Sequence, residues 1–408
     1  MFHLVTGLLA LIVCARLIWI LPVGLPLKLL LCVLTVVATQ YHQALKRWFG
    51  GMAAPDVPGW VLMLAGWGLG SVLIAAVLVL VLDVAGMLSW LVSRPLARTL
   101  LTVPVWRAGI GVLAMLAGAV AVWQAVRVPE VKRLEVPIAG LDPALDGFRL
   151  VQLSDLHASR LLQRPWMQAV VDRTNALAPD LIVITGDLVD GSVSARQDDV
   201  APLRELRAVY GVWGVPGNHE FYSLYQPWHR HFVGELGIRM LVNGHALIAG
   251  GMAPAAARQG PAVPVEGGAG EKDPGKMPAK WPVAGFVLAG LSDSAAWPYR
   301  LPIPDLEAAL EGAPADVPVI LMAHRPAGAR EHARRGVALQ LSGHTHGGQV
   351  WLMHWVVQRF NEGFVSGLYP VGQMLLYVSH GTGLWAGFPL RLGKPSEITE
   401  FTLRSAAR

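Results

Sequence analysis

Four long apolar runs occupy the first 126 residues and constrain the fold of this chain more than any other feature of its sequence. Each approaches the roughly 20 residues that an α-helix needs to cross a bilayer. None carries a polar face at helical spacing, which argues against helices packed on a soluble core. We therefore predict a transmembrane section of about four helices over residues 1–126. The predicted spans are Phe2–Leu21, Leu25–Thr39, Trp60–Leu82 and Ile110–Val126.

The first run indicates a retained helix rather than a cleaved signal peptide, because it lacks a basic start and a second apolar run follows it. We expect an integral protein of the cell (inner) membrane, with membrane lipids among its partners. The side of the membrane on which the rest of the chain lies stays open, since five basic residues flank the runs on each side.

The charges are divided unevenly along the chain. Of its 33 basic and 28 acidic residues, seven basic and two acidic ones precede Val126, so 26 of each follow. A domain without excess positive charge argues against nucleic acid as a partner. Both cysteines, Cys14 and Cys32, lie in the apolar runs. Any metal bound later in the chain must therefore be held by His, Asp, Asn or Glu.

Short apolar runs rich in β-branched residues, separated by stretches with helical spacing, begin at Phe148. This alternation is typical of an α/β fold. Polar residues recur directly after the predicted strands, at the edge of an open α/β sheet where ligands bind. The predicted strands are Leu150–Leu153, Leu181–Thr185, Val212–Val215, Phe286–Leu291, Val317–Ala323 and Ala338–Ser342.

The remaining segments complete the expected domain organisation. We assign residues 127–147 to a linker and residues 148–408 to one α/β domain. Within that domain, Gly250–Pro282 is rich in Gly, Pro and Ala and lacks periodic apolar positions. We expect this stretch to be a flexible surface insertion between two strands.

Five short segments that follow predicted strands carry side chains able to bind metal. Each alone is weak evidence, because a single Gly-Asp or Asp-x-His more often serves a turn or a cap. Together they supply the oxygen and nitrogen donors that suit two divalent cations such as Mn, Fe or Zn. Two cations about 3.5–4 Å apart need a shared carboxylate, and Asp187 is the candidate for that bridge. The segments are Asp155-Leu156-His157, Gly186-Asp187, Gly217-Asn218-His219-Glu220, His324 and Gly343-His344-Thr345-His346.

Six other histidines lack this setting after a strand, and we expect them to be ordinary surface or core residues. They are His229, His231, His245, His332, His354 and His380.

The ordered set of segments resembles the signature of calcineurin-like metallophosphoesterases, over Phe148–Leu403. The run from Gly343 to Gln349 is similar to a membrane-associated bacterial subgroup, some members of which cleave lipid-linked nucleotide sugars. The resemblance implies a layered sheet sandwich with flanking helices. It also implies that His219 contacts the substrate phosphate and can protonate the leaving group. The implied ligands are Asp155, His157 and His346 for a first metal, Asn218, His324 and His344 for a second, and Asp187 for both.

The expected function is that of a membrane-anchored two-metal hydrolase of phosphoesters, with a phosphodiester or a pyrophosphate as substrate and a lipid-linked one as an option. The alternative is a membrane sensor or scaffold whose domain binds metal or nucleotide without turnover.

Three further expectations stay open. Glu220 orients His219 or is a plain surface carboxylate, and Asp293 and Arg325 could line the pocket. Four apolar residues close to the first ligand pair either form a lip that receives acyl chains or pack a helix. They are Leu156, Leu161, Leu162 and Trp166.

Overall fold

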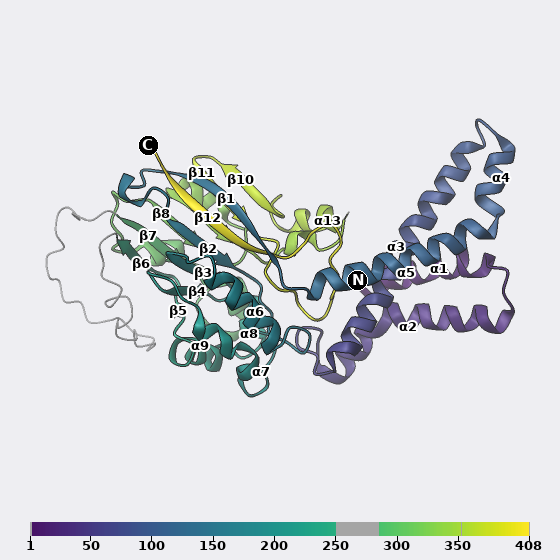
Figure 1. Ribbon diagram of the computed structural model, residues 1–408, viewed down its shortest axis with the longest axis horizontal. Coiled ribbons are helices and arrows are strands. Elements are labelled where there is room, and N and C mark those ends of the chain that lie inside the picture. Colours follow the sequence, from purple (N-terminus) through teal and green to yellow (C-terminus); the bar gives the residue numbers. More distant parts are fainter. Residues whose placement is uncertain (1, 250–284, 352, 408) are drawn as a thin grey trace.

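The computed structural model describes residues 2–249, 285–351 and 353–407. A bundle of long helices lies at one end of the molecule and an α/β body at the other (Figure 1). The expected insertion Gly250–Pro282 lies outside the described residues. It falls between strands β6 (Gly244–Ala249) and β7 (Gly285–Gly290), which pair antiparallel.

Four helices of the bundle have the length and apolar composition of membrane spans. The helix α2 extends well past the predicted Thr39, and α3 continues past Asp83. A short helix, α4 (Arg94–Thr102), connects the last two spans. The four long helices are α1 (Phe2–Arg16, continued by a 3-10 turn at Ile18–Ile20), α2 (Leu25–Phe49), α3 (Gly59–Ser89) and α5 (Pro104–Val126).

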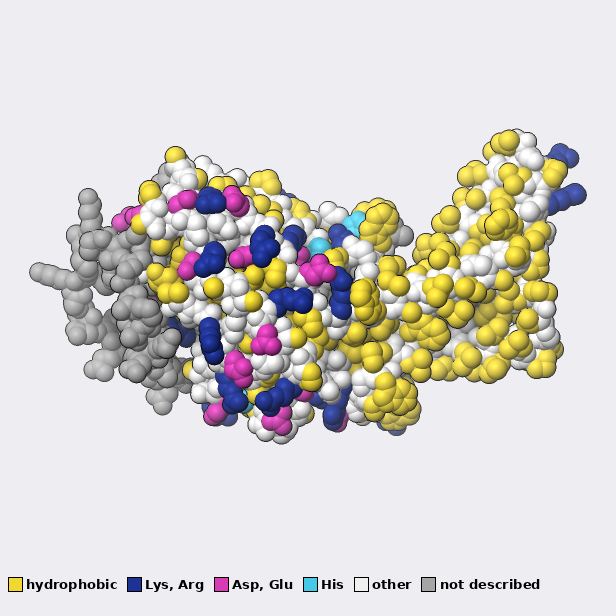
Figure 2. Space-filling model, viewed as in Figure 1, with side chains coloured by type: hydrophobic (Ala, Val, Ile, Leu, Met, Phe, Trp, Pro, Cys, Tyr) yellow, Lys and Arg dark blue, Asp and Glu magenta, His cyan; other side chains and the backbone are white. Residues whose placement is uncertain are grey.

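The extension of α3 past Asp83 has a specific cause. The two carboxylate oxygens of Asp83 accept hydrogen bonds from Arg107 Nη2 of α5 at 2.6 Å and from Arg16 Nε of α1 at 2.7 Å. Paired in this way, a charged group can lie inside a helical bundle. Hydrophobic side chains predominate on the face of the bundle that Figure 2 shows.

The α/β body contains two six-stranded sheets packed face to face, as the fold prediction required. Their strand orders are β1-β12-β2-β3-β4-β5 and β10-β11-β9-β8-β7-β6. The first sheet consists of β1 (Glu130–Ala139), β2 (Arg149–Leu153), β3 (Leu181–Thr185), β4 (Val212–Val215), β5 (Arg239–Met240) and β12 (Glu397–Ala406). The second adds β8 (Val319–Met322), β9 (Val337–Ser342), β10 (Gly367–Val371) and β11 (Met374–Val378) to β6 and β7.

Apolar side chains from both sheets form the central core, with Leu150 and Val183 of one sheet packed in the same cluster as Leu288 and Leu341 of the other. Helices cover the outer faces of the sheets, which produces a four-layer sandwich. On the first sheet lie α6 (Arg164–Asn175), α7 (Val193–Val200) and α9 (Tyr225–Gly234), and the short helix α8 (Asn218–Tyr222) directly follows β4 at the end of the sheet. The second carries α11 (Leu306–Leu310) and α12 (Ala329–Arg334), and α13 (Met353–Phe360) lies at the side facing the bundle.

The segment expected as a linker, residues 127–147, supplies a strand of the first sheet. Here β1 pairs with β12 in parallel over its whole length. Val136 and Ile138 of β1 are fully buried in the core between the sheets. Only residues 127–129 separate α5 from β1, so the bundle and the body are joined by a very short connection.

A loop ahead of β12 ties the two parts together. The hydroxyl of Tyr41 in α2 donates to the carbonyl of Gly387 at 2.6 Å, and the Arg391 N–H donates to the carbonyl of Ala121 in α5 at 3.0 Å. Leu390 is fully buried in a cluster that includes residues of α3 and α5. The loop therefore rests on three of the four long helices.

Candidate metal centre

The segments singled out in the sequence meet at one edge of the sandwich. The parallel strands β2, β3 and β4 of the first sheet and β8 and β9 of the second all end there. Because side chains that follow such strands project from the same edge, residues far apart in the sequence become neighbours. Asp155 and His157 follow β2, Asp187 follows β3, Asn218 and His219 follow β4, His324 follows β8, and His344 and His346 follow β9.

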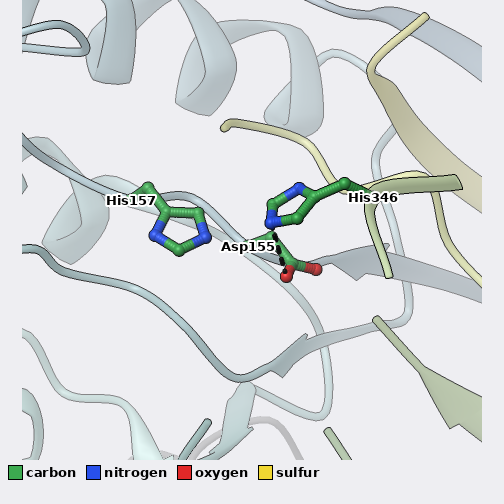
Figure 3. A group of neighbouring side chains, drawn as sticks. All are labelled: Asp155, His157 and His346. Carbon is green, nitrogen blue, oxygen red and sulfur yellow. Dashed lines mark ion pairs between the residues drawn. The ribbon is translucent and has the colours of Figure 1, made fainter. Parts of the chain in front are cut away.

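The first cluster contains Asp155, His157 and His346, whose potential ligand atoms lie within 4.8 Å of one another. His346 Nε2 is 3.6 Å from Asp155 Oδ1, and the two imidazole rings have centroids 5.2 Å apart. Figure 3 shows the His346 ring pointing at the Asp155 carboxylate, with the His157 ring beside them. All three side chains are buried, so water does not compete freely for these donors.

The second cluster converges on His324. Its Nε2 atom lies 3.2 Å from each of three other potential ligand atoms: Asp187 Oδ2, Asn218 Oδ1 and His344 Nδ1. The opposite ring nitrogen, Nδ1, lies 2.8 Å from the Thr185 carbonyl oxygen, which holds the orientation of the ring. One carboxylate, one amide and two imidazoles thus surround a common point.

Asp187 lies between the two clusters. Its Oδ2 atom is 3.6 Å from His157 Nε2 and 3.2 Å from His324 Nε2. The His157 Nε2 atom is buried and has no hydrogen-bond partner in the described part of the chain. An imidazole nitrogen left in this state needs another partner, because buried polar atoms are rarely unsatisfied. Divalent cations between these donors would satisfy it, so the residues fit the expected metals.

The backbone is strained at these positions. Five of the potential ligands have positive φ angles: Asp155 (53°), His157 (46°), Asp187 (52°), His344 (68°) and His346 (49°). Each such conformation costs about 1–3 kcal/mol in a residue other than glycine and concentrates at functional sites. At Gly343 a Cβ atom would collide with the side chains of Ser154 and Asp155, so a glycine is required for the loops to approach.

The buried charges adjust the protonation of the ligands. Burial and nearby cationic groups hold the pKa values of His344 and His346 well below the ordinary value, so both rings are neutral, as metal ligands must be. Burial lowers the pKa of His324 as well, but the Asp187 carboxylate outweighs it and raises that pKa to about 10. A cation would therefore displace a proton from His324 when it binds.

Asp190 is a site residue that the sequence reasoning missed. Its Oδ1 atom lies 3.1 Å from His157 Nδ1 and 2.6 Å from His219 Nδ1, and the carboxylate is buried. Burial lowers the pKa of His219, but Asp190 and Asp187 outweigh burial and raise it to about 9. The ring is thus protonated at neutral pH. The spacing Asp187-x-x-Asp190 in one loop was the available signal.

Glu220 does neither of the two things expected of it. The side chain is fully buried, and its carboxylate accepts hydrogen bonds from the backbone N–H groups of Gly217 at 2.7 Å, Asp187 at 2.9 Å and Leu188 at 2.6 Å. It therefore ties the loop after β3 to the loop after β4, and so fixes the position of the Asp187 backbone.

Two arginines lie next to the histidines of the last ligand loop. Arg325 donates to Asp293 Oδ2 at 2.8 Å, and its Nη1 lies 3.1 Å from His344 Nε2. This pair therefore lies beside His344 in the ligand loop. Arg391, which the sequence reasoning missed, is fully buried and its Nη2 lies 3.4 Å from His346 Nδ1.

The proposed apolar lip is not a lip. Leu156 is fully buried in the core cluster beneath α6, Leu162 is fully buried as well, and Leu161 and Trp166 are partly buried. Helix packing, the other interpretation, accounts for the fully buried pair. None of the six histidines set aside in the sequence belongs to a metal-binding group among the residues described.

Comparisons with known proteins identify the family of this domain. Residues 148–348 match the calcineurin-like phosphoesterase family, so the chain carries a calcineurin-like metallophosphoesterase domain. It is similar to a protein named "Transmembrane protein with metallophosphoesterase domain" from Danio rerio, with 33% identity over 69% of this chain and 59% of the relative. The Bos taurus protein of the same name is 36% identical over the same shares. An uncharacterized metallophosphoesterase of Helicobacter pylori is 29% identical over 67% of this chain and 64% of its own length. The chain thus spans about three-fifths of the length of the first of these relatives.

Proposed function

We propose that this protein is a membrane-anchored hydrolase of phosphoesters that depends on two divalent metal ions, with Mn, Fe or Zn as candidates. The observation that carries the proposal is the position of Asp187, whose Oδ2 lies within 3.6 Å of an imidazole from each cluster. A carboxylate that reaches two sets of donors is what a dinuclear phosphoesterase needs.

The residues divide between two metals as the family resemblance implies. Asp155, His157 and His346 would hold the first cation, and Asn218, His324 and His344 would hold the second, with Asp187 shared. When bound, the two cations would supply Lewis-acid chemistry: they would lower the pKa of water so that hydroxide is available as the nucleophile, and neutralise the negative charge that develops around phosphorus. Asp190 fixes the His157 ring through Nδ1, which leaves Nε2 facing the cluster.

His219 is proposed as the group that protonates the leaving oxygen. Its Nδ1 is hydrogen-bonded to Asp190, so the free Nε2 carries the proton to be donated. The backbone N–H of His219 also donates to Asp187 Oδ1 at 2.8 Å, which places the ring beside the metal-binding carboxylate. This pairing supports turnover over the alternative of a sensor that only binds metal or nucleotide.

The substrate class proposed is a phosphodiester or a pyrophosphate, and a lipid-linked one in particular. Two features support the membrane part of this proposal. Four helices are long and apolar enough to span a bilayer, and only residues 127–129 lie between the last of them and the α/β body. A body attached so closely stays near the headgroup layer.

The test is metal analysis and hydrolysis by the full-length protein in detergent or nanodiscs. We expect two divalent cations per chain and metal-dependent cleavage of bis(p-nitrophenyl) phosphate that chelation abolishes and metal restores. One cation or none at saturation would contradict the dinuclear site. Two bound cations without hydrolysis of any phosphodiester or pyrophosphate would instead favour the sensor.

A further inference from the structure

The helix α13 presents an apolar face that the rest of the described chain covers only in part, since Met353 and Val357 are half-buried and Val356 and Phe360 are exposed. Met353, Val356, Val357 and Phe360 recur at the i, i+3, i+4 and i+7 spacing of one helical face. Phe360 is 79% exposed and no residue of α13 is buried. Side chains of this kind are costly in water, so a face of this composition marks a contact surface.

Two further exposed tryptophans lie in the same segment, outside the i, i+3, i+4 and i+7 spacing of the apolar face. Trp355, within the helix, is 63% exposed, and Trp351, just before it, is 67% exposed. Tryptophan is enriched where one end of a side chain meets lipid and the other meets water. Figure 2 shows hydrophobic side chains over this part of the body, next to the helical bundle.

The start of α13 packs against the bundle. Val350 and Met353 pack in one cluster with Leu69 of α3 and Val122 of α5. Val122 lies four residues before the end of α5 at Val126, which corresponds to about 6 Å along the helix axis. An interfacial helix lies about 5–10 Å into the boundary between headgroups and acyl chains, so the start of α13 is at a suitable depth.

An aromatic residue at the same end of α5 marks the level of the interface. Trp123 is 56% exposed, and the Arg127 guanidinium lies over its ring at 5.0 Å. An aromatic ring beside a basic group is typical of the membrane–water boundary. Val122, which precedes Trp123, contacts the same cluster as Val350, which precedes Trp351. Trp123 and Trp351 are therefore each one residue away from a valine of the same buried cluster.

We propose that α13, with Trp351, is an interfacial helix whose occupant is the lipid surface of the membrane in which the bundle is inserted. The proposal rests on the proposed membrane insertion and deepens it by assigning a lipid contact to the metallophosphoesterase domain itself. Lipid is favoured over a second copy of the chain or a protein partner because α13 packs on α3 and α5, two of the candidate membrane spans, and Trp123, next to Val122 in α5, is exposed.

The lipid contact and the metal-ligand loop form one segment of chain. The turn His346–Gly348 leads to Val350, which forms a β-bridge with Leu392. Arg391, next in the chain, donates from Nη1 to the His346 carbonyl at 3.3 Å. A helix held in the headgroup layer therefore holds the His346 loop near that layer as well. The substrate that fits this arrangement is an amphiphile whose phosphoester lies at the bilayer surface and whose apolar part stays in the membrane.

The first test measures depth directly. In full-length protein with Cys14 and Cys32 replaced by Ala, a fluorophore is attached at Phe360→Cys, and the protein is placed in nanodiscs with or without brominated lipids. We expect brominated lipid to quench the label. A label at Val209→Cys, an exposed position at the opposite end of the first sheet, serves as the unquenched control.

A third label separates this inference from the proposal on which it rests. Leu113→Cys lies in the middle of α5 and is 54% exposed. Quenching at Leu113 without quenching at Phe360 would overturn the interfacial helix alone, and a protected label at Phe360 would point to a protein cover. Absence of quenching at Leu113 would instead overturn membrane insertion.

The second test measures the consequence for activity. Phe360→Glu should lower hydrolysis of an amphiphilic phosphodiester in vesicles by about tenfold, since an apolar anchor is replaced by a charge. Hydrolysis of bis(p-nitrophenyl) phosphate in detergent should stay the same, which would show that the site is intact. Val209→Glu should change neither rate. Equal loss on both substrates, or no loss in vesicles, would contradict a role of α13 in presenting membrane substrates.

Discussion

The helical bundle and the α/β body each bury an aspartate, but the two carboxylates have different kinds of partner. In the bundle, both oxygens of Asp83 are taken up by arginines, Arg107 and Arg16, at 2.6 and 2.7 Å. In the body, Asp187 Oδ2 faces two imidazoles that belong to separate clusters. A carboxylate paired with two arginines stabilises helix packing. A carboxylate that faces imidazoles from two clusters can instead bind a cation together with them.

The backbone differs between the two regions in the same direction. Among the described residues, every residue other than glycine with a positive φ angle lies at Asp155 or later, and five of them are potential metal ligands. In the bundle the positive angle belongs to Gly50, directly after α2, where a glycine adopts it without strain. Five of these strained positions thus lie in the candidate metal centre.

The largest effect on activity is expected at the residue shared by both clusters. Asp187→Asn should reduce activity by more than the roughly 10²–10⁴-fold of general acid catalysis, and metal content should fall with it, because an amide cannot neutralise two cations. Asp172→Asn makes the same chemical change on the exposed face of α6 and should leave both unchanged. Full metal occupancy in the Asp187 variant would show that Asp187 is not needed to bind metal, and would contradict the difference drawn between Asp187 and Asp83.

The next largest effect is expected at the proposed acid. His219→Asn should keep the metals and lose activity by roughly 10²–10⁴-fold on an alkyl phosphodiester, whose leaving group needs a proton. The loss should be much smaller with a nitrophenyl ester. Measuring kcat for both substrates together with metal content distinguishes this role from metal binding. An empty metal site in this variant would mean that His219 is itself a ligand.

A smaller effect is expected at Asp190, which acts through two histidines. Asp190→Asn should cost about 10–100-fold in activity or metal affinity, as is usual for a partner of metal-ligating groups. If Asp190 positions His219, the loss in kcat should again be greater with the poorer leaving group. A variant that loses rate equally on all substrates, at full metal occupancy, would limit Asp190 to a structural role.

The smallest effect on activity is expected in the bundle. Asp83→Asn leaves Arg107 buried without its counter-charge, and removing one partner of a buried pair typically costs about 3–5 kcal/mol of stability. We expect a lower unfolding temperature in detergent and an unchanged rate on a soluble phosphodiester per folded molecule. Asp56→Asn, at an exposed pair with Arg160, should leave the unfolding temperature nearly unchanged. Loss of hydrolysis in folded Asp83→Asn protein would show that the regions are coupled.

Much of this protein is determined by short stretches of sequence. Apolar runs of membrane length predict the four long helices, and short apolar runs predict β2, β3 and β4 within one residue of their observed bounds. The ligand segments directly follow such strands, so their common edge follows from the parallel order of an α/β sheet. These features could be predicted because each depends on residues that are close together in the chain.

The tertiary structure alone decided which distant groups meet. Asp190 lies between His157 and His219, Glu220 binds the loop after β3, and β1 joins β12 from a segment that was predicted to be a linker. The same holds for α13, whose apolar spacing is local but whose position beside α3 and α5 is not. The physical reason is that these contacts depend on how sheets and helices pack. The sequence around an Asp or Glu does not reveal which distant groups packing will place beside its carboxylate.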